Sequence, residues 1–146
     1  MRDEDPEGLA GRLTKAGHEL VQRVYFEDTD FSGRVYHARY LQFMERGRSD
    51  YLRLLGVHHR ALAVEGLAFA VRHMEIDFLK PAAIDDVVTV RTVPVETRGA
   101  RVVLAQDVLR GGEPLIRASV TVALIGAGGR PIRLPPAIRE ALTPAR

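Results

Sequence analysis

Two carboxylates, a serine, a glycine and a histidine lie close together in the segment EDTDFSGRVYH, residues 27–37. Asp28, Asp30, Ser32 and Gly33 occupy positions 1, 3, 5 and 6 of the pattern of a calcium-binding loop. The same residues could instead form a catalytic turn, in which one carboxylate faces a substrate beside the first turn of a helix. The two interpretations predict different proteins, and the rest of the sequence has to decide between them.

Arg39 argues against the calcium loop. Such a loop needs a bidentate carboxylate at its last ligand position, and Arg39 stands there, where its charge would repel the metal. A transition-metal site made from Asp28, Asp30 and His37 is disfavoured by the neighbouring cations Arg34 and Arg39. We therefore expect no bound metal.

The catalytic interpretation depends on a helix that follows the segment. The first N–H groups of a helix have no partner within it and carry partial positive charge, so they can polarise a carbonyl or hold an oxyanion. An aspartate beside them could attack that carbonyl or activate water, and either reaction would catalyse acyl transfer. An aspartate before a helix is also a common N-cap, so these residues alone leave both roles open.

The composition is that of one ordinary globular domain. The chain has 146 residues, of which 46% are hydrophobic. It has no cysteine, which excludes disulfides, thiolate metal sites and cysteine nucleophiles. Its 21 basic and 19 acidic residues give a net charge of +2, which does not indicate nucleic-acid binding. No apolar run suits a membrane span, and the acidic N-terminus lacks the apolar region of a secretion signal, so we expect a cytoplasmic protein.

The spacing of apolar residues predicts one long helix and five strands. Apolar residues recur every three or four positions from Tyr40 to Leu55, which predicts a helix that begins near residues 36–38 and is capped by Gly56. Strands are predicted at 18–26, 66–80, 87–95, 101–110 and 116–125, with glycine turns between the last three and a short helix after Pro136. The length of 66–80 predicts a bend or bulge within it.

These elements predict an α+β fold. Sequential hairpins imply an antiparallel sheet, and we expect about five strands to wrap around the broad apolar face of the helix. Residues 1–17 hold charges, glycine and proline without periodicity. We therefore predict a loose tail at 1–17, followed by a single domain at 18–146.

The segment VYFEDTDFSGRVYHARYLQFMERGRSDYL resembles the signature of hotdog-fold acyl-CoA thioesterases of the 4-hydroxybenzoyl-CoA thioesterase type. Within that group it is most similar to the subfamily associated with the Tol–Pal system. The resemblance continues through FLKPAAIDDVVTV and VETRGARVVLAQDVLRGGEPLIRASVTVALI, and so covers nearly all of residues 19–135. It departs from the family at Ala83, where related sequences often carry arginine, and at Arg34, where they commonly carry an apolar residue.

The resemblance implies an enzyme that hydrolyses an acyl-CoA to a free acid and coenzyme A, without a metal or redox cofactor. It assigns the catalytic carboxylate to Asp30, as nucleophile or as general base, and polarisation of the thioester carbonyl to the backbone N–H of His37. Gly33 and Tyr36 would line the substrate site, and Asp28 would brace the turn through hydrogen bonds. The family also implies a homodimer or homotetramer with active sites at the subunit interfaces.

Several residues outside the motif have two possible roles. Arg98 and Arg101 flank Gly99 in a turn that could hold the phosphates of coenzyme A or be a solvated hairpin. Arg48 falls inside the apolar stripe of the predicted helix with Glu45 at its edge. The two could bind substrate, but we predict a structural ion pair between them.

Two other functions remain open. A hotdog enoyl-CoA hydratase would bind the same ligand class, although this motif lacks the aspartate and histidine pattern usual in that class. A non-catalytic sensor would bind acyl-CoA without releasing a thiol. The identity of the acyl group does not follow from the sequence.

Overall fold

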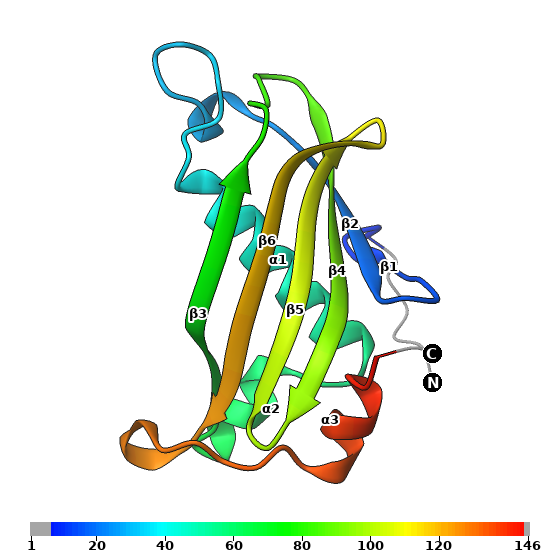
Figure 1. The fold of residues 1–146 in the computed structure, drawn as a ribbon, viewed down its shortest axis with the longest axis vertical. Helices are drawn as coiled ribbons and strands as arrows, with labels where there is room; N and C mark the ends of the chain where they lie inside the picture. Colours follow the sequence, from blue (N-terminus) through cyan, green and yellow to red (C-terminus); the bar gives the residue numbers. More distant parts are fainter. Residues whose placement is uncertain (1–6, 145–146) are drawn as a thin grey trace.

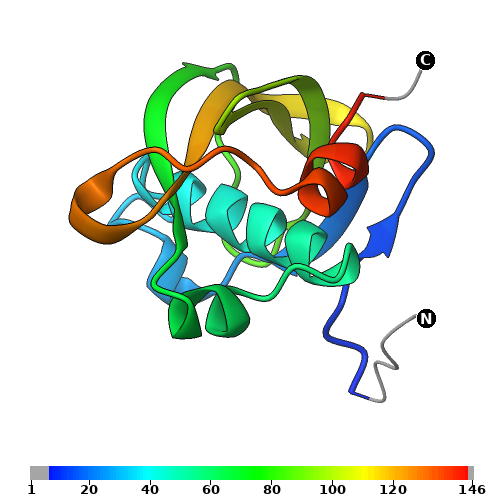
Figure 2. The same ribbon diagram turned by 90° about the horizontal axis from the view of Figure 1, so that it is seen from below.

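A computed structural model describes residues 7–144 of the chain as a curved antiparallel sheet packed around one long helix (Figures 1 and 2). The elements are, in chain order, β1 (Arg12–Leu13), β2 (His18–Arg23), η1 (Phe26–Asp28), α1 (Arg39–Leu54), α2 (His59–Val64), β3 (Ala68–Phe78), β4 (Val87–Arg98), β5 (Arg101–Arg110), β6 (Glu113–Ile125), η2 (Ala127–Gly129) and α3 (Pro136–Ala141). The sheet has six strands in the order β1-β2-β4-β5-β6-β3. The predicted α+β architecture is confirmed.

The three long hairpin strands form where the sequence predicts them, although β4 continues to Arg98 and β6 already begins at Glu113. Along β5, buried residues alternate with partly exposed ones, as expected for a strand with one face on the core. Gly99, Gly111 and Gly112 form the tight turns at its two ends, all with positive φ. The register between β3 and β6 shifts between Val71 and His73, which is the predicted irregularity in the long strand.

Helix α1 approaches the sheet closely because Gly47 has no side chain. A Cβ atom at this position would lie 2.8 Å from Cγ1 of Val90, a fully buried residue of β4. Large side chains fill the core on both sides of this crossing, among them Phe43, Met44 and Leu52 of the helix. The close approach separates the core into two apolar clusters, one toward each end of α1.

A buried polar network occupies the same crossing. Gln106 of β5 donates from Nε2 to the carbonyl oxygen of Met44 (2.9 Å) and to Oγ1 of Thr92 (2.8 Å). Its Oε1 accepts from Nη1 of Arg48 (2.9 Å). Gln106 is completely buried, so these bonds satisfy polar atoms that would otherwise destabilise the core. The hydrogen-bond partner found for the Arg48 side chain in residues 7–144 is Gln106, in place of the predicted Glu45.

A row of charged residues crosses the outer face of the sheet, one from each strand. Successive cross-strand partners in this row alternate in sign; they are Arg12, Glu19, Arg91, Asp107, Arg117 and Asp77. Glu19 forms ion pairs with both of its neighbours, Arg12 and Arg91. Opposite charges at directly paired positions stabilise a sheet, so the row supports this pairing of the strands.

The N-terminal region differs from the predicted loose tail. Residues 1–6 lie outside the described part of the chain, but Arg12–Leu13 form β1 against β2. The N–H of Gly11 donates to Oδ2 of Asp50 on α1 (2.8 Å), and the same oxygen lies 2.6 Å from Nε2 of the buried His18. A strand of two residues has too little periodicity to be recognised in a sequence.

Two further boundaries were wrong or missing. The strand predicted at 18–26 ends at Arg23, because the chain turns into η1 where Asp28 binds the N–H of Tyr25. The connector after Gly56 contains the short helix α2.

No helix in residues 7–144 is long and apolar enough to cross a membrane.

The crossing at Gly47 can be tested by Gly47→Ala. Alanine favours a helix by about 1 kcal/mol over glycine, but forcing a methyl group into a filled core costs about 1–3 kcal/mol. We expect a net loss of up to about 2 kcal/mol in the free energy of unfolding, measured by urea denaturation. The exposed helical variant Gln42→Ala serves as the control and should change little. Stabilisation by Gly47→Ala would show that the crossing is not tightly packed.

Candidate active site

Asp28 fixes the base of the loop that leads from β2 to α1. Its side chain is only 5% exposed, and its Oδ2 accepts the N–H of Tyr25 at 2.9 Å. Its carbonyl oxygen accepts the N–H of Tyr36 (3.0 Å), and its Oδ1 lies 3.4 Å from Nε of Arg39. Asp28 therefore ties the start of the loop to its end. The predicted bracing role is confirmed.

Asp30, in contrast to Asp28, is exposed to solvent. Its Oδ1 accepts hydrogen bonds from the backbone N–H of Ser32 (2.8 Å) and from the Ser32 hydroxyl. These bonds, helped by the charge of Arg34, lower the pKa of the Asp30 carboxyl against a smaller opposing effect of burial. In residues 7–144, Oδ2 accepts no hydrogen bond. Asp30 is thus an anion at neutral pH with one oxygen free to react.

The loop around Asp30 is shaped by its own backbone. Gly33 has a φ of 78°, a conformation that disfavours other residues, and its N–H donates to the carbonyl oxygen of Asp30 (3.0 Å). The N–H of Asp30 in turn donates to the carbonyl oxygen of Arg34 (2.9 Å). Gly33 therefore sets the turn that carries Asp30. Figure 1 shows this light-blue loop projecting beyond the end of the sheet, directly before α1.

Helix α1 begins just after this loop, with Ala38 at the N-cap and no side-chain cap. Within residues 7–144 no hydrogen bond uses the backbone N–H of His37. This N–H and the helix terminus supply the partial positive charge that a developing oxyanion needs. The ring of His37 packs between Tyr36 (centroids 4.4 Å apart) and Phe78 (6.4 Å), so its position is set by neighbouring rings.

A hollow opens beside the helix start. Its lining is apolar at Val35, Phe78, Leu79 and Pro81, and its polar members are Arg34, His37, Tyr40 and Lys80. Asp30 and Gly33 lie on the adjacent turn, and Tyr36 is half exposed next to His37. Of the predicted site residues, His37 lines the hollow, whereas Asp30, Gly33 and Tyr36 lie on the loop before it and outside its lining.

The far wall of the hollow is held by residues 80–86. Ala82 accepts the N–H of Val35 (2.9 Å) and donates its own N–H to the Tyr40 hydroxyl (2.9 Å). Asp86 accepts from the N–H of Ala83 and from Arg110 (2.8 Å), and these bonds lower the pKa of its carboxyl. Ala83 contributes only its small side chain and its backbone here, so the position where related sequences often carry arginine adds no cation to this wall.

Arg98 and Arg101 lie far from this surface. They pair with each other at the turn between β4 and β5, and both are exposed. The loop that carries Asp30 is held near the other end of β5, where Arg110 contacts residues 81 and 86. The ten residues of β5 span about 30 Å at the rise of a strand. One protomer therefore does not bring its own Arg98 and Arg101 to its own Asp30.

No group of three or more His, Cys, Asp or Glu side chains that could hold a metal ion occurs in the described residues.

Sequence reasoning found the loop residues because they form one contiguous motif. It missed Gln106, the partner of Arg48, because the two are 58 positions apart.

Comparison with known proteins identifies the family. A model of the thioesterase-like superfamily matches residues 24–142. The chain belongs to this superfamily. The acyl-CoA thioesterase YbgC of Haemophilus influenzae is 40% identical over 127 residues, 86% of this chain and 93% of that protein. The acyl-CoA thioester hydrolase YbgC of Escherichia coli O6:H1 is 38% identical over 70% of this chain and 78% of that protein.

The solved structures agree. A probable thioesterase from Bartonella henselae superposes with a TM-score of 0.79 at 52% identity, over 82% of this chain and all of that one. The predicted hotdog thioesterase family is confirmed, including the similarity to the Tol–Pal-associated YbgC proteins.

The electrostatics of Asp30 predict the effect of Ser32→Ala. The variant loses the hydroxyl that favours the ionised carboxylate, so the pKa of Asp30 should rise toward its ordinary value. The pH dependence of the Asp30 carboxyl carbon chemical shift measures this directly. Ser119→Ala, on the outer face of β6, is the control and should leave the titration in place. An unchanged Asp30 titration in Ser32→Ala would remove Ser32 as the cause.

Proposed function

We propose that this protein hydrolyses acyl-CoA thioesters to free acid and coenzyme A, with Asp30 as the catalytic carboxylate. The observation that carries the proposal is an ionised, exposed Asp30 on the loop that leads directly to the unpaired N–H of His37 at the start of α1. Family membership and the thioesterase activity named for the YbgC relatives support the same reaction.

The thioester carbonyl oxygen would accept the N–H of His37, so that negative charge develops beside the positive end of α1. Preorganised donors of this kind contribute about 2.7–4 kcal/mol each to acyl-transfer transition states. Gly33 would keep the loop clear of the carbonyl, and Tyr36 would flank the acyl group. No step in this scheme needs a metal or redox cofactor.

Asp30 could act as a nucleophile or as a general base. As a nucleophile it forms an anhydride with the acyl group and expels coenzyme A as a thiolate, and water then cleaves the anhydride. As a general base it takes a proton from water, the hydroxide adds to the carbonyl, and the collapsing intermediate expels the thiolate, which receives the proton. Label in Asp30 after a single turnover in ¹⁸O-labelled water would demonstrate the first route, because only an anhydride that water cleaves at the aspartyl carbonyl leaves label there.

We further propose that the protein acts as a homodimer or homotetramer in the cytoplasm, with sites between subunits. The hollow at the start of α1 is open to solvent in one protomer. Strand β3 forms one edge of the sheet over 11 residues, with exposed Val71 and Phe78 along it. A long edge strand presents unpaired backbone N–H and C=O groups that favour pairing with another chain, so a second copy along β3 would cover it.

The catalytic assignment predicts that Asp30→Asn loses activity while the fold is kept. Acid–base catalysis by one side chain contributes about 100-fold or more, so we expect kcat to fall at least that far in a thiol-release assay. Glu96→Gln also removes one exposed carboxylate, far from the loop, and should retain activity. Full activity in Asp30→Asn would exclude this mechanism. Saturable acyl-CoA binding by the unaltered protein, with no thiol release above background, would favour a non-catalytic sensor.

A contact between Arg98 or Arg101 and the phosphates of coenzyme A requires a second copy, because one protomer keeps them about 30 Å from its own loop. We propose that they serve the site of a neighbouring subunit. The double variant Arg98→Ala/Arg101→Ala should then raise KM several-fold, most clearly at low salt.

Mixed oligomers test the shared site. Co-expression of Asp30→Asn with Arg98→Ala/Arg101→Ala creates some sites that combine Asp30 from one chain with both arginines from the other. We expect those sites to show the KM of the unaltered enzyme. If the arginines act within their own subunit, the mixture will keep the raised KM. If they do not contact coenzyme A at all, the double variant will not raise KM in the first place.

A further inference from the structure

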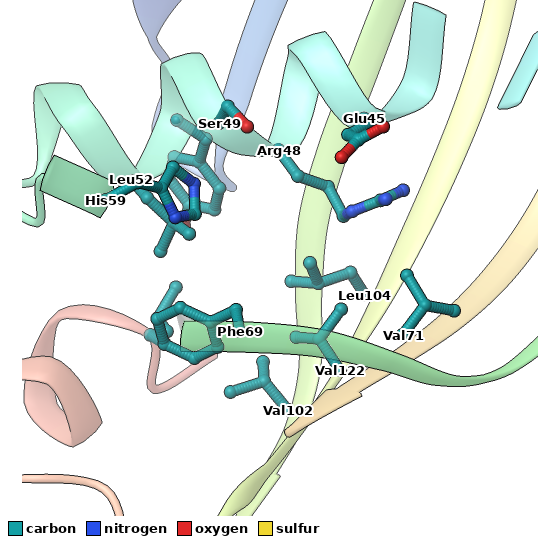
Figure 3. Close-up of a pocket in the computed structure, with 12 residues that line it drawn as sticks. Glu45, Arg48, Ser49, Leu52, His59, Phe69, Val71, Val102, Leu104 and Val122 are labelled. Atoms are coloured by element: carbon teal, nitrogen blue, oxygen red, sulfur yellow. The ribbon is translucent and has the colours of Figure 1, made fainter. Parts of the chain in front are cut away.

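A second cavity, of about 120 Å³, lies between the C-terminal half of α1 and the inner face of the sheet (Figure 3). Its walls are mostly apolar and include Phe69, Val102, Leu104 and Val122. Figure 3 shows these side chains from β3, β5 and β6 standing opposite the helix. It takes no part in the site described above, whose residues all lie near the other end of α1.

Arg48 provides a charged wall in this apolar space. Its side chain is only 8% exposed, and it leaves α1 toward Leu104 and Val71 (Figure 3). A guanidinium carries five N–H donors, and in residues 7–144 the one hydrogen bond found for it runs from Nη1 to Gln106. Among the described residues, the only fully buried side-chain nitrogen or oxygen without a hydrogen-bond partner is Nδ1 of His18. The unused nitrogens of Arg48 therefore keep some accessible surface, and Arg48 lines the cavity.

Glu45 acts on Arg48 through its charge but forms no direct ion pair with it in the described residues. It also lines the cavity but is exposed to water, which screens its charge. Burial lowers the pKa of Arg48, and the charge of Glu45 opposes that shift without a direct ion pair in the described residues. A cation in such a place is stabilised by an anion that can accept several of its N–H groups, and a carboxylate matches the planar guanidinium fork.

The size of the cavity restricts the rest of the ligand. An engineered apolar cavity of about 150 Å³ is known to hold benzene, so this space suits one ring or a short aliphatic chain. We propose that the cavity binds a small apolar carboxylate, with its anion on Arg48 and its hydrocarbon part against Phe69, Val102 and Val122.

Two sources could supply this carboxylate. One is a free short-chain or aromatic acid. The other is the far end of an acyl group that carries a terminal carboxylate. His37 and Arg48 are eleven positions apart, which is about 16 Å along a helix, so only a long acyl group could span both. Binding of a free acid does not depend on the proposed thioesterase activity and can be measured without turnover.

The experiment compares benzoate with benzyl alcohol, which has the same ring but no charge, by titration followed by ¹⁵N chemical shifts and calorimetry. We expect benzoate to bind the unaltered protein at least tenfold more tightly than benzyl alcohol, with shifts centred on residues around the cavity. In Arg48→Met this preference should disappear, and Arg48→Lys should keep part of it, because lysine retains the charge but not the fork. Equal binding of the two probes, undetectable benzoate binding, or unchanged benzoate affinity in Arg48→Met would overturn the proposal.

Val122→Phe is the second variant, because it fills the cavity and leaves Arg48 and Gln106 in place. It should abolish benzoate binding, which keeps the proposal testable if Arg48→Met fails to fold. Retained benzoate affinity in Val122→Phe would place the ligand elsewhere and also overturn the proposal.

Turnover then separates the two sources. If the carboxylate belongs to the substrate, Arg48→Met lowers kcat/KM for an ω-carboxylated long-chain acyl-CoA relative to the unsubstituted acyl-CoA of equal length. If it is a free acid, the ratio of the two kcat/KM values is unchanged. Absence of any thiol release would count against the proposed hydrolysis and leave the binding result standing.

Discussion

The close contact between α1 and β4 at Gly47 is the constraint on which the rest of the structure depends. A helix that lies this near a sheet leaves no room for a side chain at the crossing, and the backbone of Met44 comes within reach of Gln106. The crossing fixes the height and direction of the helix over the sheet. Because the helix cannot shift, its first turn lies at one end of the sheet and Arg48 lies over the inner face of the sheet.

The two aspartates of the loop before α1 lie in different environments. Asp28 is buried and holds the two ends of the loop together, whereas Asp30 is exposed on a turn whose hydrogen bonds favour its ionised form. The two differ because Asp28 ends η1 at the base of the loop, whereas Asp30 begins the turn that the Gly33 N–H closes. Asp28 thus anchors the loop and Asp30 is available to react, although they are only two positions apart. The N–H groups of the helix terminus follow in the chain.

Local patterns made the helix, the hairpins and the motif around Asp30 predictable, because each is encoded within a few consecutive residues. The remaining features depend on register and on contacts distant in sequence. The partner of Arg48 is on β5, and the distance from Asp30 to Arg98 follows from the length of a strand that the motif does not contain. The helix α2 and the strand β1 were missed because each is too short to show a period.

The charged row on the outer face of the sheet has a consequence for how the chain finds its pairing. A strand that slips by one residue turns its apolar side chains to water, so the hydrophobic pattern already opposes odd slips. A slip by two residues keeps the faces correct, and would place Arg91 opposite Ala105 in place of Asp107. Each such slip separates opposite charges. The row therefore disfavours pairings shifted by two residues, which the apolar pattern alone would allow.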